Sequence, residues 1–299
     1  MASLPDKWQA FAWQGIQLEV PERWNPAAME GEAADGYVRL DDDEDVRLQI
    51  RWRTSRKPQS PSRIVDHYLK MTQGRRGGKT SGDGRTRRNT SLVRLPDTET
   101  ECFQITGDPV EFGMAVQCGR CRRHALLSLL SARGRPEKSL ARRIFGSYSD
   151  EPQGELVPWA VYGFRFATPL RFSMSDYAAN AGRLAFAFRH GRTRLRAIRV
   201  SLAETLLRDH ALVDWVRKDV RKDFSDWVMA WPTGTDVREF TATGRRRRLA
   251  GWCLRRHRAW CRVRHAPAAN ALYIAEWFGR ERDEDAFNAF AASLDTGHL

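Results

Sequence analysis

The feature that most constrains the fold is an internal repeat. Residues 15–24 read GIQLEVPERW and residues 163–172 read GFRFATPLRF, so a glycine, a proline, an arginine and a final aromatic residue recur at an offset of 148. The segment IVDHYLK at 64–70 matches LVDWVRK at 212–218 at the same offset. Ordered matches at one offset indicate two copies of one domain.

A third match and a linker-like stretch place the boundary between the copies. GYVRL at 36–40 aligns with GRLAF at 182–186 at an offset of 146. The segment SDEPQGELVPWA at 149–160 is rich in proline, glycine and acidic residues, as domain linkers often are. We therefore predict two similar domains, at residues 1–150 and 151–299.

Each copy is expected to be built mainly from strands. The repeated opening alternates apolar and polar residues, which is typical of a half-buried strand, and the proline ends it. The acidic run DDDED at 41–45 predicts a hairpin tip, and an apolar stripe along 212–220 predicts a helix that Asp209 can cap, as Ser60 or Ser62 can in the first copy. Hairpin spacing with a few helices favours an α+β fold, a mainly antiparallel sheet packed with helices.

The opening strand-Pro-x-x-aromatic element and the order of elements resemble the PsbP-like α/β/α sandwich superfamily. That superfamily includes a photosystem II extrinsic subunit, a Ran-binding nuclear import factor and bacterial lipoproteins of the DcrB type. The resemblance rests on GIQLEVPERW and GFRFATPLRF. It implies a tandem PsbP-like protein, a non-enzymatic scaffold that binds macromolecules, and it assigns no active-site residues.

The chain is strongly basic. It has 299 residues, a net charge of +13 and 50 Lys+Arg residues, of which most are arginine. Such a chain attracts nucleic acid, anionic membrane surfaces or acidic proteins, unless arginine merely replaces lysine on solvated faces. Two basic segments, 74–88 and 244–251, are candidates for phosphate contacts. Their basic residues are Arg75, Arg76, Lys79, Arg85, Arg87, Arg88, Arg245, Arg246, Arg247 and Arg248.

The composition predicts a soluble, cytoplasmic protein. No apolar run approaches the ~18 residues that a membrane span needs, and the N-terminal residues do not read as a secretory signal. Five cysteines, an odd number without a regular framework, fit a reducing compartment.

One Cys-x-x-Cys motif is a candidate metal or redox site. Cys118 and Cys121 are followed by His124, at an expected hairpin turn. The pair can be half of a zinc site or an oxidisable dithiol, although a second pair for a zinc ribbon is missing from the sequence. The corresponding stretch of the second copy, 263–270, has neither cysteine, so the fold does not require them.

Cysteine and histidine also alternate every four residues, at Cys253, His257, Cys261 and His265. If two strands turn about His257, Cys253 and Cys261 lie opposite each other, and the pattern follows from strand geometry. We interpret these residues as structural cysteines of a hairpin, with a metal site or a redox pair as the alternatives.

No nucleophile motif, zinc-protease motif, calcium loop or P-loop is present in the sequence. We therefore expect a protein without a cofactor, and we lean against an enzyme. The hypothesis is a two-domain interaction or adaptor protein with an unidentified protein partner. The alternatives are a nucleic-acid-binding protein that uses its Arg-rich loops, and a metal or redox protein that uses Cys118 and Cys121.

Overall fold

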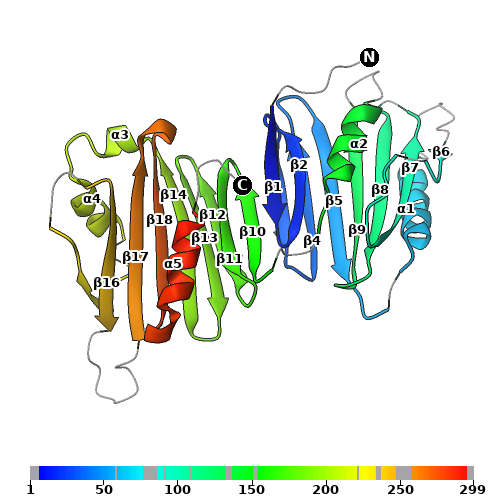
Figure 1. Ribbon diagram of the computed structural model, residues 1–299. Helices are drawn as coiled ribbons and strands as arrows, with labels where there is room; N and C mark the ends of the chain where they lie inside the picture. The colour runs from blue at the N-terminus through cyan, green and yellow to red at the C-terminus, as the bar shows by residue number, and fades with distance from the viewer. Residues whose placement is uncertain are drawn as a thin grey trace. The chain divides into compact units, whose positions relative to one another are not determined.

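The structure is a computed structural model that describes most of the chain (Figure 1). Among the described residues, no helix combines the length and the apolarity needed to cross a membrane. The described residues are 7–57, 59–76, 86–90, 92–107, 109–131, 137–150, 154–220, 222–233, 237–246 and 257–294.

The chain divides into two compact units. Unit 1 comprises residues 1–152 and 160–162, and unit 2 comprises residues 153–159 and 163–299. Each unit contains an antiparallel seven-stranded sheet, and the two sheets have the same strand order when the strands are counted along the chain. The two units therefore repeat one topology.

The sheet of unit 1 has the order β3-β4-β5-β9-β8-β7-β6. The central strands β8 and β9 join at a tight turn, and every residue of β8 is buried. The strands are β3 (Asn25–Gly31), β4 (Asp35–Asp41), β5 (Val46–Thr54), β6 (Thr86–Arg87), β7 (Thr98–Ile105), β8 (Glu111–Cys118) and β9 (Arg123–Leu130).

Both faces of this sheet are covered. Helix α1 (Pro61–Arg76) packs on β7 and β8, where Val65 lies among Phe103, Ile105 and Ala115. Helix α2 (Lys138–Gly146) contacts β8 and also β2, which forms a hairpin with β1. These two strands span Trp8–Trp13 (β1) and Ile16–Pro21 (β2).

The sheet of unit 2 has the order β12-β13-β14-β18-β17-β16-β15. In β18 only the last residue is exposed. The strands are β12 (Ser173–Asn180), β13 (Arg183–His190), β14 (Thr193–Ser201), β15 (Trp227–Ala230), β16 (Glu239–Arg246), β17 (His257–Ala266) and β18 (Ala271–Arg280).

Both faces of the second sheet are covered by apolar side chains. One face carries an aromatic cluster in which Phe164 and Phe166 pack on Phe186, and α5 (Glu284–Ala292) adds its own aromatic contacts. These two phenylalanines belong to β11 (Phe164–Pro169), which pairs with β10 (Leu156–Val161). The opposite face mixes aliphatic residues with aromatic ones such as Phe224 and Phe278, and lies under α3 (Ala203–Leu206) and α4 (Leu212–Asp219).

The expected α+β class is wrong, because the fold is β-rich. Strands account for 52% of the structure and helices for 19%. In unit 2, α3, α4 and α5 have only four, eight and nine residues. The helices cover small parts of sheets whose strands reach ten residues, so sheet pairing dominates the architecture.

Several local expectations are confirmed. Strands β2 and β11 end at Pro21 and Pro169, since proline has no N–H for a sheet ladder. The acidic run lies at the β4–β5 turn, where the Asp42 carboxylate accepts the backbone N–H of Asp45. Asp209, however, does not cap α4, whose N-cap residue is Ala211.

The expected turn about His257 is also wrong. His257 is the first residue of β17, which then continues as one strand. Cys261 lies opposite Ala242 of β16 in the observed register, and Cys253 lies outside the described residues. The regular spacing of cysteine and histidine therefore does not arise from a hairpin centred on His257.

A charged network is buried under α4. Glu276 of β18 is completely buried and lies opposite Arg196 of β14 on one side and Cys261 of β17 on the other. The Arg196 guanidinium bridges Glu276 and Asp223, at 3.0 and 2.5 Å.

This network contains more carboxylates than guanidinium groups. Arg183 makes a second ion pair with Asp219, so three carboxylates share two guanidinium groups. Burial, only partly offset by Arg196, raises the pKa of Glu276 to about 7.

This raised pKa predicts that unit 2 loses stability as pH rises from about 4.5 to about 7. Over that window the folded carboxyl of Glu276 holds a proton that the unfolded carboxyl has released, so the free energy of unfolding falls. Glu276→Gln should remove this fall, a difference of about 3 kcal/mol. Urea unfolding of both proteins at several pH values measures it.

The matched control is Glu239→Gln, which alters an exposed glutamate of β16. It should keep the wild-type pH dependence. Identical pH dependence in the wild type and in Glu276→Gln would show that Glu276 does not bind the proton.

Candidate functional site

The outer strand β12 offers an open sheet edge. It is the last strand of its sheet, and six of its eight residues are exposed. A bulge interrupts its pairing with β13 between Met174 and Asp176, and regular pairing then runs to Asn180. Asp176 is the only charged residue of the strand.

Edge strands usually carry features that prevent another strand from adding to them, such as proline, charge or a bulge. The equivalent edge strand of unit 1, β3, has a bulge together with Pro26 and Glu30. Strand β12 shares the bulge and has one acidic residue, Asp176, but it has no proline, and Ala178 and Ala179 are both exposed. We call residues 176–180 the β12 edge.

A strained leucine, Leu202, directly follows β14, at the same end of the sheet as Asn180 of β12. Leu202 has a φ of +61°, the left-handed region that a leucine rarely adopts, and its side chain is 61% exposed. Hydrogen bonds fix the backbone on both sides of it. The Ser201 N–H donates to Gly182 in the β12–β13 turn, and the Ala203 N–H donates to the Asn270 carbonyl.

Such strain persists only where the surrounding structure imposes it, and it concentrates at functional sites. An exposed apolar side chain held in this way, at the same end of the sheet as Asn180 of the open strand, is suited to contact a partner. It marks the β12 edge as the candidate functional site.

The other end of β12 is basic. Ser173 pairs with Arg189, and the adjoining β13–β14 turn brings Arg192 and Arg194 to the same end. All three arginines are exposed. A segment that adds to β12 therefore runs between two different ends of the sheet. The Asn180 end carries the apolar Leu202, and the Ser173 end carries the three arginines.

The predicted nucleic-acid residues lie partly outside the described chain. Lys79, Arg85, Arg247 and Arg248 belong to segments that the structure does not describe, and Arg75 and Arg76 are described only as backbone of α1. Arg87 lies in β6.

The remaining basic residues have defined surroundings. Arg88 makes ion pairs with Asp66 and Glu101, at 2.5 and 2.7 Å. Arg245 and Arg246 are exposed residues at the end of β16, where they pair with β15. Arg88 thus serves a structural network, whereas Arg245 and Arg246 are available at the surface.

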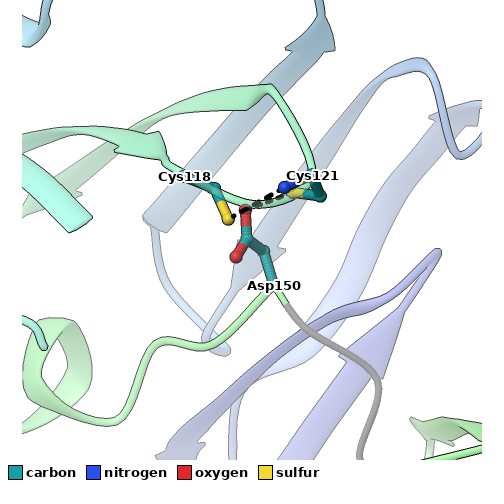
Figure 2. A group of neighbouring side chains, drawn as sticks. All are labelled: Cys118, Cys121 and Asp150. Atoms are coloured by element: carbon teal, nitrogen blue, oxygen red, sulfur yellow. Dashed lines mark hydrogen bonds between the residues drawn. The ribbon is translucent and has the colours of Figure 1, made fainter. Parts of the chain in front are cut away.

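The Cys-x-x-Cys motif gains a third member that the sequence did not indicate. Cys118 ends β8, Cys121 lies in the turn, and the ligand atoms of both lie within 4.8 Å of each other and of an Asp150 carboxylate oxygen (Figure 2). The Cys121 thiol contacts Oδ2 of Asp150 at 3.4 Å, and its backbone N–H donates to Cys118 Sγ at 3.4 Å.

The surroundings of Cys121 favour its protonated form. Burial raises the pKa of Cys121 to about 12, while a backbone hydrogen bond with Arg123 partly opposes the rise and the neighbouring Cys118 and Asp150 add to it. A neutral thiol is a poor nucleophile, so this arrangement does not favour a reactive redox cysteine.

His124 does not join this group. It pairs with Gln117 across the β8–β9 hairpin, whereas Cys118 is the next residue along β8 and projects to the opposite face of the sheet. Burial and the nearby Arg53 lower the pKa of His124.

Comparison with known proteins gives no family for the chain. No protein family profile matches the sequence, and no curated protein does. Among solved structures, the apo structure of immunity protein TplEi of the T6SS from Pseudomonas aeruginosa is 12% identical and has a TM-score of 0.33. The matched region covers 97% of this chain and 96% of the TplEi chain. At this TM-score the likeness supports neither a fold nor a function, and the PsbP-like resemblance stays a prediction.

The strain at Leu202 predicts a stabilising substitution. Leu202→Gly should raise the free energy of unfolding by roughly 0.5–1 kcal/mol, because glycine adopts a positive φ without a steric cost and the exposed side chain contributes little burial. Thermal unfolding measures the change. Leu202→Ala removes the same side chain but keeps the strain, so its melting temperature should stay close to that of the wild type. A glycine variant less stable than the alanine variant would contradict the strain.

Proposed function

We propose that the chain is a non-catalytic binding protein, and that unit 2 binds an extended segment of a partner protein that adds as a strand to the β12 edge. One observation carries this proposal: an exposed edge strand with a single charge and no proline, whose pairing is regular from Asp176 to Asn180. Strand addition gives affinity through main-chain hydrogen bonds and specificity through side chains at the ends of the strand.

The surroundings of β12 define the chemistry of the partner. Leu202 favours an apolar side chain near the Asn180 end, and the three exposed arginines near Ser173 favour an acidic one. An acidic segment also suits the overall charge of +13, which speeds encounter with a negatively charged partner. We place the protein in the cytoplasm, because its cysteines fit a reducing compartment.

Nucleic acid is the competing partner class. Binding to it should collapse with rising salt and with nuclease treatment, whereas a strand-addition complex depends on backbone hydrogen bonds and tolerates both better.

Proline substitutions in the β12 edge test the proposal. In an antiparallel pair the N–H groups of successive residues alternate between the neighbouring strand and the free side. Of Ala178→Pro and Ala179→Pro, one therefore breaks a bond with β13 and lowers the melting temperature, while the other leaves the fold intact and removes a donor from the open edge. The variant with the unchanged melting temperature should lose the partner protein that the wild type captures from nuclease-treated host extract.

Each proline variant serves as the matched control for the other, because both replace an exposed alanine of one strand. Ala28→Pro, in the equivalent strand of unit 1, tests whether the effect belongs to β12. Undiminished capture by the stable β12 variant, or capture that nuclease abolishes, would refute strand addition.

A further inference from the structure

Cys118, Cys121 and Asp150 bring together three possible metal-ligand atoms from two separate segments of the chain. The two cysteines belong to the β8–β9 turn, and Asp150 follows α2. An isolated bridge holds the second segment in place, because Ser149 and Gln17 exchange two backbone hydrogen bonds, of 2.7 and 2.9 Å. The fold thus positions Asp150 beside the turn (Figure 2).

The distances between the two sulfur atoms and the carboxylate oxygen suit a single small cation. In a tetrahedral zinc site, Zn–S bonds of about 2.3 Å place two sulfur atoms about 3.8 Å apart, and a sulfur and an oxygen slightly closer. Here the ligand atoms lie within 4.8 Å of one another, and the Cys121 sulfur and the Asp150 oxygen are 3.4 Å apart. A shift of about 1 Å or less therefore completes the geometry.

A separate observation points to a ligand at this place. The hydroxyl of Tyr148 is fully enclosed and makes no hydrogen bond to any described residue. Its electrostatic neighbours are Asp150, Arg123, Cys121 and Cys118, so the hydroxyl lies beside the cysteine–aspartate group. A buried hydroxyl without a partner costs about 1–3 kcal/mol, unless a bound species supplies the missing hydrogen bond.

The charges also balance around a divalent ion. Two thiolates and one carboxylate exceed the charge of a divalent cation by one. Arg123 supplies that positive charge, because its guanidinium is buried in the same neighbourhood and binds the carbonyl oxygens of Gln14 and Ala33. The backbone N–H of Cys121 also donates a hydrogen bond to Cys118 Sγ.

We propose that Cys118, Cys121 and Asp150 bind one Zn²⁺ ion, with a water molecule at the fourth position that is hydrogen-bonded to the Tyr148 hydroxyl. Thiolates select a soft or borderline cation such as zinc over magnesium or calcium. The two thiols release two protons on binding, so the affinity increases with pH. The ion links the β8–β9 turn to the segment after α2. In unit 2 the corresponding β17–β18 turn is closed by Pro267–Ala269 and Asn270, without cysteine.

Cobalt titration of the reduced full-length chain tests the site. One equivalent of Co²⁺ should produce a sulfur-to-cobalt charge-transfer band, which one equivalent of Zn²⁺ should abolish by displacement. Cys118→Ser and Cys121→Ser should each lower the metal affinity on the order of 100-fold or more, and Asp150→Asn on the order of 10–100-fold. Tyr148→Phe should keep the band and weaken binding about 10-fold, as expected for a residue that orients a ligand.

Two other cysteines provide the controls. Cys102→Ser and Cys261→Ser remove buried thiols outside the group and should leave the titration unchanged. For any variant that folds poorly, thiol labelling of the folded wild type gives the second readout, since Zn²⁺ should protect Cys121 from an alkylating reagent.

Three results would overturn the proposal. The first is a reduced wild-type chain that gives no charge-transfer band. The second is a band that Asp150→Asn leaves unchanged in strength and affinity. The third is a chain that binds no metal but forms a Cys118–Cys121 disulfide on air oxidation, which would make the pair a redox site instead.

Discussion

The fold depends on burying both faces of a wide antiparallel sheet. Strands β8 and β18 have almost no exposed residue, so they cannot follow the simple inside–outside alternation of a half-buried strand. Any polar residue in them needs a partner inside the sheet layers. Glu111 of β8 accepts hydrogen bonds from Tyr68 and Ser128, at 2.6 and 2.8 Å, and Glu276 of β18 pairs with Arg196. The neighbouring strands supply two of these partners, Ser128 and Arg196, and helix α1 supplies Tyr68.

Local sequence rules predicted the parts of the fold that local chemistry controls. A proline must end a strand ladder, and an acidic run must lie in water, so the ends of β2 and β11 and the β4–β5 turn follow from the residues alone. The fold class did not follow, because apolar periodicity marks α4 clearly but says nothing of how many strands pair beside it. The turn about His257 failed because register depends on pairing with β16, which no local pattern reveals.

In the candidate sites, too, local features were predictable from the sequence and long-range contacts were not. The Cys-x-x-Cys turn was visible in the sequence, but Asp150 was not, since it reaches the turn only through the Ser149–Gln17 bridge. His124 was excluded by the alternation of side chains along a strand, a rule that applies only once β9 is known to begin at Arg123. The β12 edge was not predicted, because the lack of a neighbouring strand is a property of the assembled sheet.

Comparison of the two units distinguishes what the topology requires from what one copy has added. Both units share strand order, a bulged outer strand and helices on both faces, so these features serve the fold. The cysteine–aspartate group occurs at the β8–β9 turn and not at the corresponding turn of unit 2, where a left-handed Asn270 closes the loop instead. That same Asn270 holds the strained backbone after Leu202. The turn without the cysteines thus holds the segment that follows Leu202, so the same position in the repeat makes different contacts in each unit.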